Sequence, residues 1–129
     1  MKLSVKITLI LSVLIAGIAA CQSPSKKTEK ASSPEDLAAG LALLKSNCYT
    51  CHTPQGGQSE RIAPPMIAIK RHYIDENTTK EEFTRVLIAY VQNPSEDKSK
   101  MPGARRKFGL MPAQSFSAKQ LAQIAAYLY

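Results

Sequence analysis

The sequence contains no tryptophan, only three cysteines, and few aromatic residues, which make up 6% of the chain. Three scattered cysteines exclude a disulfide-dense secreted scaffold, and no segment repeats at the spacing of a solenoid protein. The longest apolar stretch, Ile7 to Ala20, is broken by Thr8, Ser12 and Gly17 and is too short for a clear membrane span. A chain of 129 residues has room for one small domain, whose modest core benefits from an additional source of stability.

The amino terminus has the pattern of an export signal. Lys2 and Lys6 precede the apolar stretch, and the first 20 residues contain no acid. The segment ends in Ile18-Ala19-Ala20-Cys21, which resembles a bacterial lipobox, so Cys21 is predicted to become the lipidated mature amino terminus. An ordinary cleaved signal with an incidental Cys21 is the alternative. We therefore expect a signal peptide over 1–20, the lipidated Cys21 with a flexible polar tether over 21–33, and a domain over 34–129.

The rest of the chain predicts an all-α domain of about four helices. The first helix is expected to start at the Ser33 cap and to run to about Asn47. The second is expected over 65–73, the third from a cap within 77–79 to the stop at Asn93-Pro94, and the last from the Ser117 cap onwards. Residues 95–116 contain two Met-Pro pairs and two glycines and are predicted to form a loop.

Cys48-Tyr49-Thr50-Cys51-His52 has the C-x-x-C-H spacing of a c-type haem attachment site. Two thiols three positions apart on a tight turn are able to add to the two vinyl groups of one porphyrin, and the next imidazole then reaches the iron. A thioredoxin-like dithiol expects a βαβ setting, and a zinc site expects two further ligands. Neither is supported, because the sequence has no strand signal and His72 is the only other histidine.

With this motif, residues 34–129 resemble the small single-haem cytochromes c. In that family a glycine eight residues before the first motif cysteine lets the first and last helices cross closely, and Gly40 has that spacing here. A proline twelve residues after the motif histidine matches Pro64, whose carbonyl would accept a hydrogen bond from the imidazole. Ala63 and Met66 depart mildly from the family pattern around this proline. The resemblance implies a cytochrome c-like fold around one covalent haem c.

The resemblance also implies a second axial ligand, usually a methionine thioether. Met111 lies six residues before the Ser117 cap, as in the family, and is the preferred candidate. Met101 remains an alternative, as does an open or His-ligated iron. Met66 is expected to pack in the haem pocket, and His72 is expected to be a surface or hydrogen-bonded histidine rather than a ligand.

These features predict an exported, membrane-anchored electron carrier rather than an enzyme. It would pass single electrons between redox proteins, facing the periplasm or the cell exterior, without nucleic acid or a small-molecule substrate. The alternatives are a haem subunit of a larger oxidoreductase and an open-site haem enzyme or sensor. The chain has a net charge of +7, and five bases crowd the segment 95–116 that contains the two Met-Pro pairs, which favours an acidic docking partner. These five are Lys98, Lys100, Arg105, Arg106 and Lys107.

Overall fold

The computed structural model describes residues 31–55, 57 and 59–129, and within them all regular structure is helical. The elements in chain order are α2 (Pro34–Leu43), the π-helical turn η1 (Leu44–Cys48), α3 (Met66–Tyr73), α4 (Lys80–Gln92), α5 (Pro102–Phe108) and α6 (Ala118–Leu128). The predicted all-α architecture is therefore confirmed. The signal over 1–20, the lipobox Cys21 and nearly all of the predicted tether lie outside the described residues.

The helix starts follow local capping chemistry. The hydroxyls of Ser33, Thr79 and Ser117 each accept a hydrogen bond from a backbone N–H three residues later, at the starts of α2, α4 and α6. Gln120 completes a capping box with Ser117. These side chains satisfy donors that have no partner within the first turn of a helix. The predicted starts of these three helices are thus confirmed.

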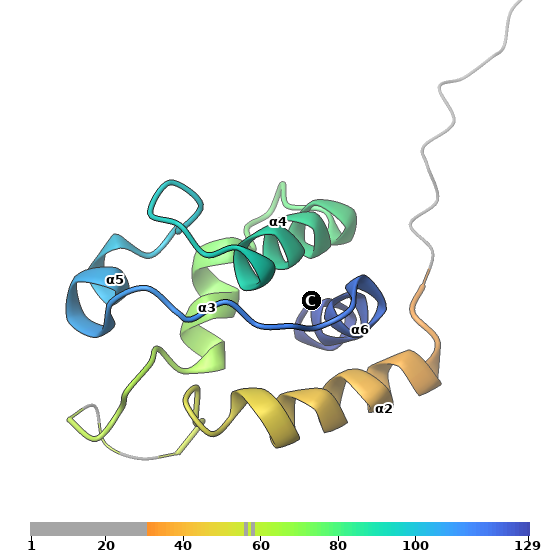
Figure 1. Ribbon diagram of the computed structural model, residues 1–129. Coiled ribbons are helices and arrows are strands. Elements are labelled where there is room, and N and C mark those ends of the chain that lie inside the picture. Colours follow the sequence, from red (N-terminus) through yellow and green to blue (C-terminus); the bar gives the residue numbers. More distant parts are fainter. Residues whose placement is uncertain (1–30, 56, 58) are drawn as a thin grey trace, which may run out of the picture.

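Helix α6 lies between α2 and α4 and packs on both (Figure 1). Its apolar face, Leu121, Ile124, Ala125 and Leu128, is buried. The opposing surfaces contribute Leu44 from η1 and Phe83 and Leu87 from α4. This three-helix contact forms the core that supports the rest of the domain.

The crossing of α2 and α6 is very close at Gly40. A Cβ atom added there would lie 2.1 Å from the carbonyl oxygen of Gln123 on α6. The same crossing is bridged by a hydrogen bond of 3.1 Å from the Gln123 amide nitrogen to the Asp36 carboxylate. A residue with no side chain is therefore needed at position 40, as the sequence predicted.

The prediction of a loop over 95–116 is wrong for residues 102–108, which form α5. Pro102 is the first residue of this helix, where proline costs no hydrogen bond. The helix ends at Gly109, whose φ of 78° favours glycine. Seven residues are too few to show a helical repeat in the sequence, and tertiary contacts fix the segment instead. The Tyr73 hydroxyl accepts a hydrogen bond of 3.1 Å from the Lys100 N–H, and Met101 packs in the core.

We expect Gly40→Ala to lower the free energy of unfolding of the holoprotein by about 3 kcal/mol, at the upper end of ordinary overpacking costs. The new methyl group would meet a backbone carbonyl, which is unable to move without separating the two helices. Gly103→Ala is the matched control, because its nearest neighbour is the end of the Arg106 side chain at 4.0 Å. Chemical denaturation of both variants measures the difference, and equal stability would contradict the close-crossing argument.

Candidate functional site

The cysteine motif follows a widened last turn of the first helix. The Tyr49 N–H donates to the Leu44 carbonyl at 2.9 Å, a bond that spans five residues and defines the π-helical turn η1. The Ser46 hydroxyl donates a hydrogen bond to the Ala42 carbonyl, and the Asn47 side-chain amide donates one to the Leu43 carbonyl. In a regular α-helix these carbonyls would accept from the backbone N–H groups four residues later. The sequence predicted a helix to about Asn47, and the helical path does reach Cys48, but its last turn is not α-helical. Such π turns occur frequently at functional sites.

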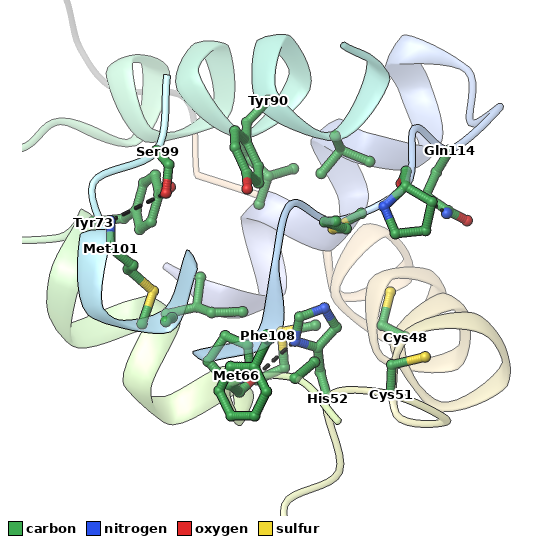
Figure 2. Close-up of a pocket in the computed structure, with 18 of the residues that line it drawn as sticks. Cys48, Cys51, His52, Met66, Tyr73, Tyr90, Ser99, Met101, Phe108 and Gln114 are labelled. Carbon is green, nitrogen blue, oxygen red and sulfur yellow. Dashed lines mark hydrogen bonds between the residues drawn. The ribbon is translucent and has the colours of Figure 1, made fainter. Parts of the chain in front are cut away.

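The motif itself folds into a compact turn. The Cys48 carbonyl accepts hydrogen bonds from the Cys51 N–H at 3.2 Å and from the His52 N–H at 2.8 Å. This turn brings Cys48, Cys51 and His52 to one side of a cavity (Figure 2). Both cysteines are free thiols, Cys48 half-buried and Cys51 exposed. Burial, with a smaller contribution from Cys51, raises the pKa of the Cys48 thiol.

The His52 ring is held in one orientation. Its Nδ1 lies 2.6 Å from the Pro64 carbonyl oxygen (Figure 2). A carbonyl only accepts hydrogen bonds, so Nδ1 is the protonated nitrogen and the neutral ring keeps the lone pair of Nε2 for a ligand. Burial lowers the pKa of His52, against a smaller opposing effect of the Pro64 bond, so the neutral imidazole is favoured. The structure thus contains the predicted contact between His52 and Pro64.

The cavity beside the motif has a volume of about 260 Å³ and is lined mainly by apolar side chains. Helices α3, α4 and α6 and the segment 99–116 form its walls. Met66 lines the cavity together with His52 and Phe108 and packs against the core cluster, which agrees with the packing role predicted for it. His72, in contrast, is exposed, and its Nδ1 lies 2.8 Å from the Ala68 carbonyl.

Met101 and Met111 both line the cavity, but in different settings. Met101 is only 9% exposed and belongs to the core cluster. It lies beside Tyr73 and Ser99, on the side away from the two motif cysteines (Figure 2). Met111 is half-buried and is not part of that cluster. It lies in the irregular segment that joins α5 to α6, which is tied to α4 by a hydrogen bond of 2.9 Å from the Gln114 N–H to the Val91 carbonyl.

The cavity wall also carries polar groups that the sequence did not identify as site residues. Tyr73, Tyr90, Ser99 and Arg105 all line the cavity. The Ser99 hydroxyl accepts a hydrogen bond of 3.3 Å from the Met101 N–H. Burial is the largest of the effects that raise the pKa of Tyr73. In the sequence Arg105 is one of five clustered bases that favour an acidic docking partner, and no motif marks it as a cavity residue.

The family model for cytochrome c matches residues 37–129. The chain belongs to the cytochrome c family. Proteins of this family bind covalent haem c and carry electrons, and their domains are typically exported. No solved structure matches the chain.

The residues around the cavity fit a c-type haem. The cavity is apolar, two free thiols lie at one side, and His52 keeps one nitrogen available beside them. In the part of the chain that the structure describes, no three His, Cys, Asp or Glu side chains gather as a metal site. Across those same residues, no helix has the length and apolar character needed to cross a membrane.

We expect Met111→Ala to abolish the methionine-to-iron charge-transfer band of the oxidised holoprotein, whereas Met101→Ala keeps it. Met111 faces the cavity without being part of the core, while Met101 packs with Tyr73 on the far side. The far-red absorption spectrum measures the band, and added cyanide or carbon monoxide reports an opened iron. The opposite pattern would transfer the ligand role to Met101, and a wild type lacking the band would favour an open-site protein.

Proposed function

We propose that this protein is an exported single-electron carrier with one haem c, attached through Cys48 and Cys51 and bound at the iron by His52. The observation that carries the proposal is the apolar cavity that has both motif thiols and the oriented His52 ring at one side. The bound iron would supply reversible exchange of one electron between its ferric and ferrous states. The residues of the chain hold the group and limit its contact with water.

His52 and Met111 are the proposed axial ligands. The Pro64 carbonyl fixes the His52 ring and strengthens its donor nitrogen, as hydrogen-bonded partners of metal-ligating histidines do. A thioether on the other side stabilises ferrous iron and raises the potential. Two ligands from the chain would leave the iron no open position for a substrate, so this ligand pair supports electron transfer rather than catalysis.

An apolar rim at the cavity mouth supports contact with redox proteins. Ile62 is 67% exposed and Leu110 is 42% exposed, and both line the cavity. Cys51, the second proposed attachment residue, is exposed to solvent and also lines the cavity. A partner that covers these residues would bring its own redox centre close to the haem edge without a polar barrier.

Exposed bases of the segment 100–107 support steering towards an acidic partner. Lys100, Arg106 and Lys107 are exposed. Lys98 and Arg105 are half-buried; Lys98 donates to the Asn93 carbonyl at 2.8 Å, and Arg105 pairs with Glu96. The exposed ammonium groups of Lys100 and Lys107 lie over the rings of Tyr73 and Phe108, at 5.8 Å and 5.0 Å from the ring centres. Charges around a docking surface raise the encounter rate more than the affinity. We therefore assign the docking role to Lys100, Arg106 and Lys107.

We further propose that Cys21 carries the lipid that attaches the protein to a membrane. The lipobox-like sequence Ile18-Ala19-Ala20-Cys21 and the apolar segment before it support this role. Several acyl chains on one residue give durable attachment, which a single chain does not. The polar residues 22–33 would then link the anchor to the domain.

In the native host, substitution of the motif cysteines is expected to remove covalent haem, and substitution of Cys21 is expected to remove membrane attachment. Cys48→Ser with Cys51→Ser should remove covalent haem, because no thiol remains to form a thioether bond, while lipid attachment persists in any chain that survives. Cys21→Ala should keep the haem spectrum and release the protein from washed membranes. The mass of the denatured chain and its partition after a high-salt wash are the two measurements. Normal covalent haem in the double variant would refute the attachment site, and membrane retention of Cys21→Ala would refute the anchor.

We expect Arg106→Glu with Lys107→Glu to slow oxidation of the ferrous protein by hexacyanoferrate(III) about tenfold at low ionic strength. The anionic oxidant serves as a probe of the charge near the haem edge. Arg85→Glu with Lys119→Glu is the control, since these exposed residues make the same change in net charge but lie on α4 and α6, whereas Arg106 and Lys107 stand between the cavity-lining residues Arg105 and Phe108. Stopped-flow rates over a salt series should converge as screening increases. Equal slowing by both pairs would remove α5 from the docking surface.

A further inference from the structure

The π turn η1 changes the direction in which the cysteine motif faces. A π turn contains one residue more than an α-helical turn, and successive residues of an α-helix lie about 100° apart around its axis. Residues after η1 are therefore displaced by one position from the face that they would occupy in a continuous α-helix. The repeat of α2 alone does not determine which motif side chain meets the cavity.

Packing on the core determines which residue follows Leu44 on the buried face. Leu44 is completely buried, and Tyr49, five residues later, packs against the same core cluster. In a continuous α-helix the residue four positions after Leu44, which is Cys48, would take this place. With the additional residue in the turn, Cys48 lines the cavity (Figure 2) and Tyr49 does not.

Two polar side chains bond the backbone at the point where the helix changes. The Ser46 hydroxyl donates to the Ala42 carbonyl at 2.9 Å, and the Asn47 amide nitrogen donates to the Leu43 carbonyl at 3.1 Å. Short polar side chains can bond a carbonyl one turn earlier and so compete with the regular hydrogen bonds of a helix. These two bonds supply donors to carbonyls beside the turn, where the backbone pattern changes from four-residue to five-residue bonds.

Asn47 connects this bonding to the cavity. Its amide nitrogen also donates to the Ser46 hydroxyl oxygen at 2.7 Å, so the two side chains form one small network. Asn47 directly precedes Cys48 and lines the cavity beside it, whereas Ser46 does not line the cavity. Asn47 is therefore the member of the network that lies closest to the first motif thiol along the chain.

We propose that Asn47 is a positioning residue for attachment of the haem at Cys48, an inference that rests on the proposed haem attachment. Its side chain, with that of Ser46, holds the π turn that directs the Cys48 thiol into the cavity. In the attachment step the thiol adds across a vinyl group. A carbon–sulfur bond forms, the second bond of the vinyl group breaks, and the thiol proton moves to the other vinyl carbon. This addition consumes no oxidant or reductant, and its rate depends on the placement of the sulfur.

The second thiol is held by contacts that do not involve the Asn47 side chain. The N–H groups of Cys51 and His52 both donate to the Cys48 carbonyl, at 3.2 Å and 2.8 Å. The His52 ring is fixed separately by the Pro64 carbonyl, 2.6 Å from its Nδ1. Cys51 thus belongs to a turn with a support of its own. Loss of the Asn47 amide should therefore impair attachment at Cys48 more than at Cys51.

The test counts thioether bonds at each cysteine in the full chain, produced in its native host. Haem-containing chains are denatured and alkylated with iodoacetamide, which marks only a thiol that has formed no thioether bond. Trypsin then releases the peptide between Lys45 and Arg61, and fragment mass spectrometry locates the label. In Asn47→Ala the fraction labelled at Cys48 should rise about tenfold, because small displacements of a reacting atom cost one to two orders of magnitude in rate. Cys51 should remain unlabelled.

Two further variants serve as controls. Thr50→Ala makes a similar change between the two cysteines, at an exposed residue whose side chain bonds to no part of the chain that the structure describes. It should leave both thioether bonds intact. Asn47→Ser retains a short donor that can reach a carbonyl one turn earlier, as Ser46 does, and should restore attachment at Cys48.

Complete attachment at Cys48 in Asn47→Ala would overturn the proposal, as would equal labelling of both cysteines or an equal loss in Thr50→Ala or Asn47→Ser. If Asn47→Ala yields no haem-containing chain, Ser46→Ala decides instead. It removes one bond of the network, so a smaller rise at Cys48 alone is expected, and full attachment would count against the proposal. Haem absent from the denatured wild-type chain would reject the proposed function itself, whereas doubly attached haem in every variant rejects only the role of Asn47.

Discussion

The close contact between α2 and α6 at Gly40 is the constraint on which the rest of the domain depends. With the Gln123 carbonyl lying where a Cβ atom would be, the two helices are fixed at a short separation, and Leu44 one turn later is completely buried. The chain then leaves the helix through the π turn and presents the cysteine motif beside the buried face of α6. A wider crossing would move the motif relative to the cavity that it serves.

Several core side chains pack on one another and also form part of the cavity wall. Phe83, Leu121 and Leu128 belong both to the core cluster and to the cavity wall. A small domain with apolar walls around a cavity of about 260 Å³ gives up contacts that a filled core would make. A covalent haem in the cavity would replace those contacts, so the proposed attachment would also stabilise the domain.

The basic side chains of the segment 95–107 have three different settings. The Lys98 ammonium donates to a backbone carbonyl, Arg105 lies between Glu96 and the cavity, and Arg106 extends into solvent. In the sequence these bases form one cluster, and their separation follows from the short helix α5. One face of this helix contributes to the cavity wall, and the other contributes to the surface next to the exposed Leu110.

The sequence by itself determined the parts of the protein that depend on local chemistry. Residues a few positions apart determine the caps at Ser33, Thr79 and Ser117 and the apolar face of the last helix. The C-x-x-C-H spacing predicts a haem attachment site before the fold is known. The spacings of Gly40 and Pro64 also anticipated their contacts, through the family resemblance. Only the tertiary structure decided the π turn before Cys48, the helix α5, and the separate settings of Met101 and Met111. These depend on packing between segments far apart in the chain, such as the bond from Lys100 to Tyr73, and no local pattern of residues encodes such contacts.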